Sequence, residues 1–247
     1  GLAELAAMVD QGRGVESFVA SIETIVHGTT VATNATLTGT GAKSALLTTE
    51  GIRDALEMRR GIREEQYNNA YTNVKPLVPR YLRAGVKGRL DRAGREIAPL
   101  DLAGIDAAIA EFRREGVEAV SICFMNSYAN PAHEAAAAER VRAAMPDAFL
   151  TVSSTLLPSI RFYERVSTTA LNSYVGPKLN RYVEQLVSRL ASAGFRGTLL
   201  IMQSNGGVMA PEVARSSPAL TLLSGPAGGF GAGLYYAKAL GAELAIT

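Results

Sequence analysis

Residues 101–125 read DLAGIDAAIAEFRREG followed by VEAVSICFM, and this stretch decides the fold class. Its first part predicts a helix because four apolar side chains repeat at helical spacing: Leu102, Ile105, Ile109 and Phe112. Asp101 stands at the expected N-cap and Gly116 at the expected stop. The apolar run that follows predicts a buried strand. A helix that leads into a buried strand is typical of a parallel α/β sheet.

The same alternation extends in both directions and predicts an α/β fold with parallel strands. Further strands are expected at 23–28, 43–49, 148–154, 197–203 and 243–247. Further helices are expected at 29–37, 50–58, 130–146, 169–194 and 224–241. Asn130 and Pro131 form the expected start of the fourth predicted helix, and Gly176-Pro177 predicts a break or bend in the long one. Residues 59–99 are rich in Pro and Arg and predict an extended insertion with a β-hairpin.

Composition narrows the function classes. The 247 residues are 47% hydrophobic and 19% charged, with a net charge of +2, so no strong overall field favours nucleic acid. One cysteine, Cys123, excludes a disulfide framework and indicates a reducing compartment, while two histidines argue against structural zinc. No apolar run approaches the roughly 20 residues of a membrane helix, and no secretory signal is visible. The first residues resemble the middle of a helix and the last a strand just begun, so we expect an incomplete fragment.

The motif IVHGTTVATNA, residues 25–35, is the first candidate site. A Gly-Thr-Thr turn at a helix start offers free N–H groups and two hydroxyls, which suit a phosphate or a carboxylate. The alternative is that Thr29 or Thr30 only caps the helix and His27 only ends the strand.

Two further motifs are rich in glycine. LLSGPAGGFGAG, residues 222–233, lets a backbone approach a ligand closely, but it has neither the Rossmann order nor the Gly-Lys-Ser/Thr of a P-loop. Close helix packing explains it equally well. IMQSNGGVM, residues 201–209, places polar side chains at a strand end, where α/β folds bind ligands, although a plain Asn-Gly-Gly turn has the same sequence.

Two charged segments complete the candidates. Residues 160–177 gather Glu164, Arg165 and several hydroxyls, which could orient a substrate or form a helix cap with surface ion pairs worth less than ~1 kcal/mol. Lys75 to Arg95 hold seven basic residues and one acid, Asp91, which suits a nucleic-acid patch or a docking surface. Acidic neighbours blunt this patch and disfavour nucleic acid: Asp54, Glu57, Glu64 and Glu65.

Seven motifs in this order resemble the hydantoinase A / 5-oxoprolinase family, which includes the ATP-dependent acetone and acetophenone carboxylase subunits. They are IVHGTTVATNA, GAKSALLTTEGIRDALEMRRG, PLVPRYL, SYANPAHE, LPSIRFYERVSTTALNSYVGP, IMQSNGGVM and LLSGPAGGFGAG. The resemblance covers nearly the whole chain. It implies an actin- and sugar-kinase-like (ribonuclease H-like) ATPase fold, with residues 1–194 as a partial N-terminal-type domain and 195–247 as the start of the catalytic, nucleotide-binding domain.

The resemblance also implies an activity. A carbonyl is activated by phosphorylation from ATP, with Mg²⁺ or Mn²⁺, and either a cyclic amide is opened or a ketone is carboxylated. The implied partner is a hydantoinase B-like subunit or domain in a cytoplasmic hetero-oligomer, with a small-molecule substrate, no nucleic acid and no membrane. The alternatives are a non-catalytic assembly subunit and a module that recruits partners through residues 75–95.

The resemblance finally implies site residues. Those expected to be catalytic or near the substrate are His27, Thr29, Thr30, Glu164, Arg165 and Thr168. Those expected to bind the cofactor are Asn205, Gly206, Gly207, Ser224, Gly225, Gly228 and Gly229. The family's two acidic, metal-organising glycine loops lie outside this sequence, so the metal ligands are unknown. Many relatives carry His where this chain has Asn126, which puts a proton-transfer role there in doubt.

Overall fold

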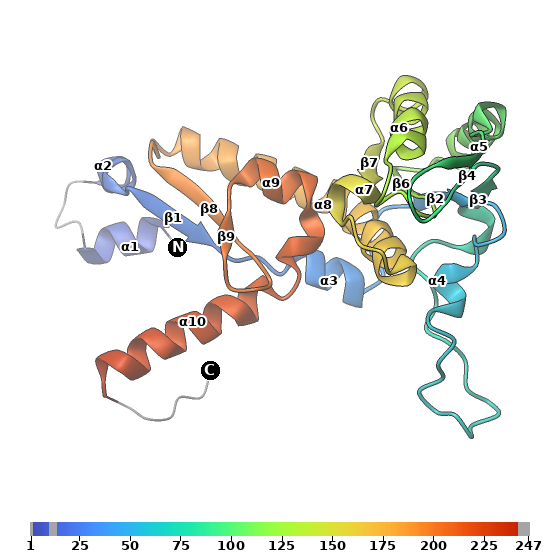
Figure 1. Cartoon of the computed structure of the whole chain (residues 1–247). Helices are drawn as coiled ribbons and strands as arrows, with labels where there is room; N and C mark the ends of the chain where they lie inside the picture. The colour runs from blue at the N-terminus through green and yellow to red at the C-terminus, as the bar shows by residue number, and fades with distance from the viewer. Residues whose placement is uncertain (1, 10–13, 242–247) are drawn as a thin grey trace. The chain divides into compact units, whose positions relative to one another are not determined.

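A computed structural model of the chain describes residues 2–9 and 14–241 (Figure 1). They form two compact units, here unit 1, Gly1–Thr40 with Lys178–Thr247, and unit 2, Gly41–Pro177. The strand predicted at 243–247 lies outside the described residues. The sequence-based division at 194–195 separates the chain differently and stays a prediction. None of the described helices is both long and apolar enough to cross a bilayer.

Unit 2 is built on a four-stranded parallel sheet in the order β3-β2-β6-β7. These strands are Arg83–Val86, Ser44–Thr49, Ala119–Cys123 and Phe149–Val152. Every residue of β2 and β6 is buried, and Leu47 lies opposite Ile122 in their register. Near-continuous burial is what a parallel sheet covered on both faces requires. The predicted parallel α/β fold is therefore present in this unit.

Helices α5 and α6 begin within two residues of their predicted starts. At α5, Leu102–Arg114, the Asp101 carboxylate accepts the Gly104 N–H at 3.0 Å and thereby caps the helix. At α6, Ala132–Ala144, the Asn130 side chain accepts the Ala132 N–H at 3.0 Å, and Pro131 precedes the helix instead of lying in its first turn. The shorter helices are α4 (Ala55–Met58), η1 (Arg80–Leu82) and α7 (Ser153–Leu156).

The prediction that 59–99 is an insertion is partly wrong. The hairpin is present as β4, Arg89–Leu90, paired with β5, Glu96–Ala98. However, Arg83–Val86 is β3, an edge strand of the main sheet, parallel to β2. Its first residue is an arginine, which a buried strand rarely holds; the Arg83 side chain is only 3% exposed and donates from Nε to the Val78 carbonyl at 2.9 Å and from Nη1 to the Glu57 carboxylate at 3.2 Å.

Helix α8, Phe162–Ser192, is one continuous helix that contains Pro177, so the predicted break is absent and the alternative of a bend stays a prediction. It also starts seven residues before the predicted position, which places Glu164 and Arg165 in its first turn. Its residues up to Pro177 belong to unit 2 and those from Lys178 to unit 1.

Unit 1 holds a three-stranded sheet in the order β1-β8-β9, namely Thr24–His27, Thr198–Met202 and Val208–Met209. β1 and β8 are parallel, with His27 opposite Ile201, and β9 returns antiparallel to β8. The helices are α1 (Leu2–Val9), α2 (Val15–Ser21), α3 (Val31–Leu37), α9 (Pro211–Ser216), η2 (Pro218–Thr221) and α10 (Ser224–Ala239). The carboxyl ends of β1 and β8 point toward the starts of α3 and α10 (Figure 1).

Candidate functional site

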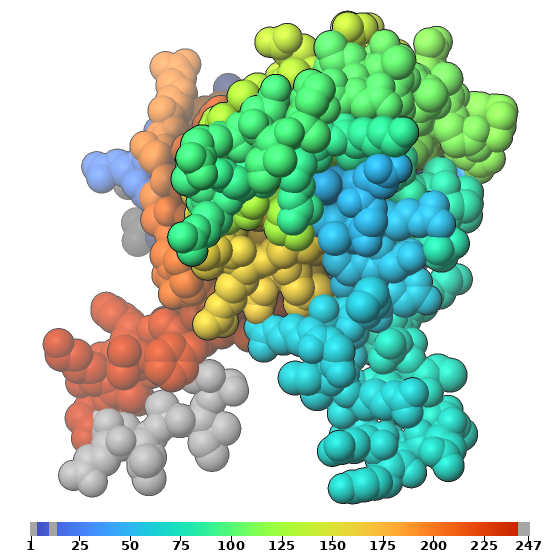
Figure 2. Space-filling model, turned by 45° about the vertical axis from the view of Figure 1, so that its right-hand side comes forward, coloured from blue at the N-terminus to red at the C-terminus, as the bar shows by residue number. Residues whose placement is uncertain are grey.

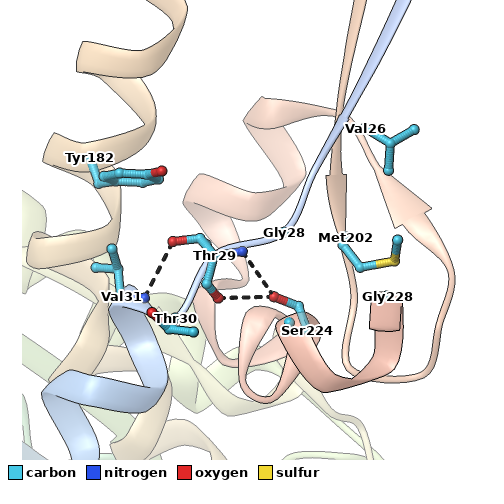
Figure 3. Close-up of a pocket in the computed structure, with 10 residues that line it drawn as sticks. Val26, Gly28, Thr29, Thr30, Val31, Tyr182, Met202, Ser224 and Gly228 are labelled. Carbon is cyan, nitrogen blue, oxygen red and sulfur yellow. Dashed lines mark hydrogen bonds between the residues drawn. The ribbon is translucent and has the colours of Figure 1, made fainter. Parts of the chain in front are cut away.

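The turn between β1 and α3 consists of Gly28, Thr29 and Thr30 (Figure 3). The buried Thr29 hydroxyl accepts the Val31 N–H at 3.3 Å. Thr30 stands at the N-cap position, but its hydroxyl makes no cap bond and instead accepts from the Asn34 amide at 3.3 Å. The capping role foreseen for this motif therefore falls on Thr29, and the Thr30 side chain lies at the surface of the turn.

Ser224, the first residue of α10, fastens the glycine-rich segment to this turn. Its fully buried hydroxyl donates to the Thr29 carbonyl at 3.0 Å and faces the Thr29 N–H at 3.4 Å (Figure 3). The preceding Leu223 has a left-handed backbone, φ 58°, and its N–H donates to the Thr33 hydroxyl at 3.0 Å. Two motifs 195 positions apart are thus held together by a hydroxyl that satisfies both backbone groups of one residue.

A pocket of about 790 Å³ opens between these two motifs. It is lined by Val26, Gly28, Thr29, Thr30, Val31, Tyr182, Met202, Ser224, Gly225 and Gly228 (Figure 3). Its size lies in the range of small-molecule and cofactor sites. A Cβ at Gly225 would lie 3.6 Å from Thr30 Cγ2, and one at Gly228 3.5 Å from Met202 Cε. The glycines thus keep open a space that alanine side chains would begin to fill.

His27 supports the pocket from behind Tyr182. Its Nε2 lies 2.6 Å from the Tyr182 hydroxyl, and the two rings stack with centroids 5.8 Å apart. Burial lowers the pKa of His27 below 6.5, so the ring is neutral at pH 7. In the tautomer with its hydrogen on Nδ1, Nε2 accepts a hydrogen bond from the Tyr182 hydroxyl. Tyr182 was missed because it lies outside the quoted motifs, and its partner His27 is 155 positions away in the sequence.

The predicted residues Asn205, Gly206 and Gly207 do not line the pocket. They form the tight turn between β8 and β9, where the Asn205 side chain accepts the Gly207 N–H at 2.8 Å and Gly206 has φ 84°. Local geometry therefore agrees with the simple Asn-Gly-Gly turn. Gly229 is also outside the lining, one residue past Gly228.

The predicted residues Glu164, Arg165 and Thr168 belong to unit 2, not to the unit that holds the pocket. Glu164 forms an ion pair with Arg60, and Thr168 is half-buried. Arg165 is fully buried, and its guanidinium donates to the Phe124 carbonyl at 2.8 Å and to the Ser153 hydroxyl at 3.0 Å. Their catalytic roles stay predictions.

Glu134 is the acidic partner of Arg165 and was missed from sequence. It is also fully buried, with Oε1 3.8 Å from Arg165 Nη1. Its carboxylate accepts from two backbone N–H groups, those of Phe124 at 2.8 Å and Ser154 at 2.7 Å. It also accepts from the hydroxyls of Ser127 and Ser153, at 2.7 and 2.6 Å. The only signal was an acid in the first turn of an alanine-rich helix.

Three other sequence candidates have structural roles. Asn126, with φ 60°, donates from its side chain to the Leu90 carbonyl at 2.8 Å and ties the turn after β6 to the hairpin. Cys123 is buried, and burial raises its pKa to about 12, so the thiol is protonated at pH 7 and a poor nucleophile. In the basic run, Arg80 pairs with Asp54, and Arg95 with Asp91.

Comparison with known proteins places these features in one family. The family model described as "Hydantoinase/oxoprolinase N-terminal region" matches residues 2–145, and "Hydantoinase/oxoprolinase" matches residues 165–247. Caprolactamase subunit alpha of Pseudomonas jessenii is 40% identical over 249 residues, which are 100% of this chain and 36% of the relative.

Solved structures agree. The ATP-dependent caprolactamase from Pseudomonas jessenii superposes with a TM-score of 0.88 at 40% identity, over 98% of this chain and 35% of that one. A nucleotide-free acetone carboxylase gives 0.84 at 24% identity, over 95% and 34%. The predicted α/β fold is confirmed, and the chain spans about a third of the length of these relatives.

Proposed function

The chain belongs to the hydantoinase/oxoprolinase family, and from this premise we propose that the pocket of unit 1 binds phosphate groups of ATP. The observation that carries the proposal is the Ser224 clasp, which holds the start of α10 beside the turn after β1. The first N–H groups of a helix have no partner within the helix and favour anionic oxygens. Backbone and hydroxyl groups then dominate one wall of the pocket, as phosphate recognition requires.

The pocket residues take different parts in this proposal. Thr30, Gly225 and Gly228 border the phosphates, because all three line the pocket. Thr29 and Ser224 shape the wall through the bonds they make to each other. His27 orients Tyr182, so its role is positioning. Only the family motif supports a cofactor-binding role for Asn205, Gly206, Gly207 and Gly229.

We propose that the full protein transfers the γ-phosphoryl group of ATP to the oxygen of a carbonyl substrate. For a cyclic amide, water then adds to the activated carbon and the ring C–N bond breaks, which frees the amine and leaves an acyl phosphate. A second water hydrolyses the acyl phosphate to the carboxylate and phosphate. Carboxylation of a ketone is the other reaction implied by the family. The 40% identity to a caprolactamase subunit supports the cyclic amide.

The proposal also includes a metal ion and a partner subunit. The lining residues carry no carboxylate, and the described residues hold no group of three His, Cys, Asp or Glu side chains that could bind a metal ion. The described pocket therefore does not fit Mg²⁺ or Mn²⁺ by itself, and no step is assigned to the metal. The relative's name, subunit alpha, supports a hetero-oligomer. A hydantoinase B-like partner and a cytoplasmic location remain part of the proposal.

The test is nucleotide turnover by the full-length protein with lactams, hydantoins and ketones, with and without bicarbonate. We expect lactams to stimulate release of ADP and phosphate, and Thr30→Ala to lower that turnover more than tenfold, about 1.4 kcal/mol. Thr38→Ala is the matched control, because Thr38 is exposed and its hydroxyl bonds to Asn34 and Thr40, which are near it in the sequence. Unchanged turnover in folded Thr30→Ala would remove the pocket from the mechanism.

A further inference from the structure

A second cavity lies in unit 2, at the base of the segment that follows α4. It measures about 230 Å³ and is lined by Arg59, Arg60, Ile62, Glu64 and Tyr163; we call it the Arg59 cavity. Residues near 60–75, cyan to teal, stand out from the rest of unit 2 in Figures 1 and 2. Nothing in the mechanism above uses this cavity.

The backbone at Arg59 is strained. It has φ 55° and ψ −126°, a region that side chains with a Cβ rarely adopt. Such conformations persist only where the surroundings hold them, and they gather at functional sites. Glycine would relieve the strain, so the presence of arginine points to a use for the side chain.

The Arg59 guanidinium has an unmet hydrogen bond. Its Nη2 pairs with the Glu64 carboxylate, and Glu64, followed by Tyr163, raises the pKa of Arg59. Its Nη1 is shielded from solvent, yet no residue in the described part of the chain accepts a hydrogen bond from it. A buried donor without an acceptor is unfavourable, and a ligand oxygen would satisfy it.

The charges around the cavity are already balanced. Arg59 pairs with Glu64 and Arg60 with Glu164. The Arg59 hydrogen bond lowers the pKa of Glu64 to about 2, and the pKa of Glu164 is also lowered, first by its own backbone N–H and then by Arg60. Both acids are therefore ionised at pH 7 and cancel both arginines. A carboxylate ligand would add an unbalanced negative charge, whereas a neutral ligand would not.

We propose that the Arg59 cavity binds a small neutral amide. The amide oxygen accepts from Arg59 Nη1, and its N–H donates to the carboxylate of Glu64, which also lines the cavity, so both halves of the amide have partners. A ketone meets only the first requirement, and a carboxylate would bring a negative charge that no cation of the cavity is free to balance. This rests on the proposed function for the claim that the amide is the substrate, although binding itself needs no ATP.

The experiment measures binding of δ-valerolactam to the full-length protein by ligand-observed NMR, without ATP. Its N-methyl derivative, cyclopentanone and valerate are the comparison probes. Arg59→Gly is the test variant and Arg63→Gly the matched control, since Arg63 is an exposed arginine outside the lining. We expect Arg59→Gly to weaken lactam binding at least tenfold while raising Tm, because strain is relieved. A purely structural arginine would not separate these two readouts.

The other outcomes are equally decisive. Arg63→Gly should leave lactam binding unchanged, and the N-methyl lactam should bind at least tenfold more weakly than the parent. The proposal is overturned if the wild-type protein does not bind δ-valerolactam, if Arg59→Gly binds it normally, or if valerate binds more tightly. ATP binding is measured separately: lactam binding without ATP binding keeps the Arg59 cavity and rejects the proposed function.

Discussion

Two strand-to-helix turns, one after β1 in unit 1 and one after β6 in unit 2, use their polar side chains in different ways. Both follow an apolar strand, and both carry hydroxyl side chains before or near the next helix. After β6, the paired side chains of Glu134 and Arg165 fill the space beneath the turn and are both fully buried. After β1, Ser224 and glycines border the turn and leave a pocket.

The difference shows how to tell a structural polar turn from a binding one. Beneath the β6 turn, the Glu134 carboxylate accepts four hydrogen bonds from within unit 2, so its own oxygens are already satisfied. In the β1 turn, Thr29 is satisfied, but Thr30 and the backbone of Gly225 and Gly228 face open space. Satisfied polar groups stabilise the fold, and polar groups that face a cavity are available for chemistry.

Among the variants that test this difference, Arg165→Ala should have the largest effect. It leaves the Glu134 charge buried without its partner, which should destabilise the protein by about 3–5 kcal/mol. Urea unfolding measures the change, and Arg161→Ala, an exposed arginine on the approach to the same helix, should alter stability by less than about 0.5 kcal/mol. A loss below ~1 kcal/mol for Arg165→Ala would mean that the buried pair does not hold the β6 turn.

Two helical glycines, Gly176 in unit 2 and Gly228 in unit 1, test the same difference between filled and open space. A Cβ at Gly176 would overlap the Phe149 ring, so Gly176→Ala should destabilise unit 2 by about 1–3 kcal/mol. A Cβ at Gly228 meets only Met202 at ordinary contact distance, so Gly228→Ala should stabilise α10 by about 0.5–1 kcal/mol and weaken ATP binding. Urea unfolding and a nucleotide titration measure both. Equal stability changes of the same sign would show that the pocket is no more open than the core of unit 2.

Ser224→Ala removes the hydroxyl that joins the start of α10 to the turn after β1. It leaves the buried Thr29 carbonyl and N–H without the hydroxyl, at about 1–3 kcal/mol of stability, and frees the start of α10. ATP binding should weaken by more than the smaller fraction of folded protein explains, because the pocket wall moves. Ser21→Ala, which removes an exposed hydroxyl, is the control. If Ser224→Ala binds ATP as well as the wild type does, the clasp does not shape the site.

The sequence predicted the regular parts of both units well. The helix from 101 to 116 and the strand after it followed from apolar spacing, because one buried face needs apolar residues at a fixed period. The edge strand β3 was not predicted, because its buried first residue, Arg83, is held by the Val78 carbonyl and by acidic partners instead of by apolar packing. Spacing along the chain contains no record of such a partner.

The site was predictable only in part, for the same reason. The turn motif and the glycine-rich motif each have a local pattern, and Thr29, Thr30, Ser224, Gly225 and Gly228 do meet at one pocket. Arg165 carries the same kind of local signal, yet its long-range partner Glu134 gives it a buried structural environment. Tyr182 carries no signal at all, because only the fold brings it to His27.

The smallest expected effect is the pH dependence due to His27. Burial lowers its pKa in the folded state, so between that value and 6.5 the unfolded chain binds more protons. Stability should therefore fall as the pH decreases from about 7 through this window, and His27→Gln should remove that part of the slope. Tyr182→Phe keeps the titrating ring and should retain it. Urea midpoints at several pH values measure the difference, and parallel curves for wild type and His27→Gln would show that His27 is not buried enough to support the pocket wall in its neutral form.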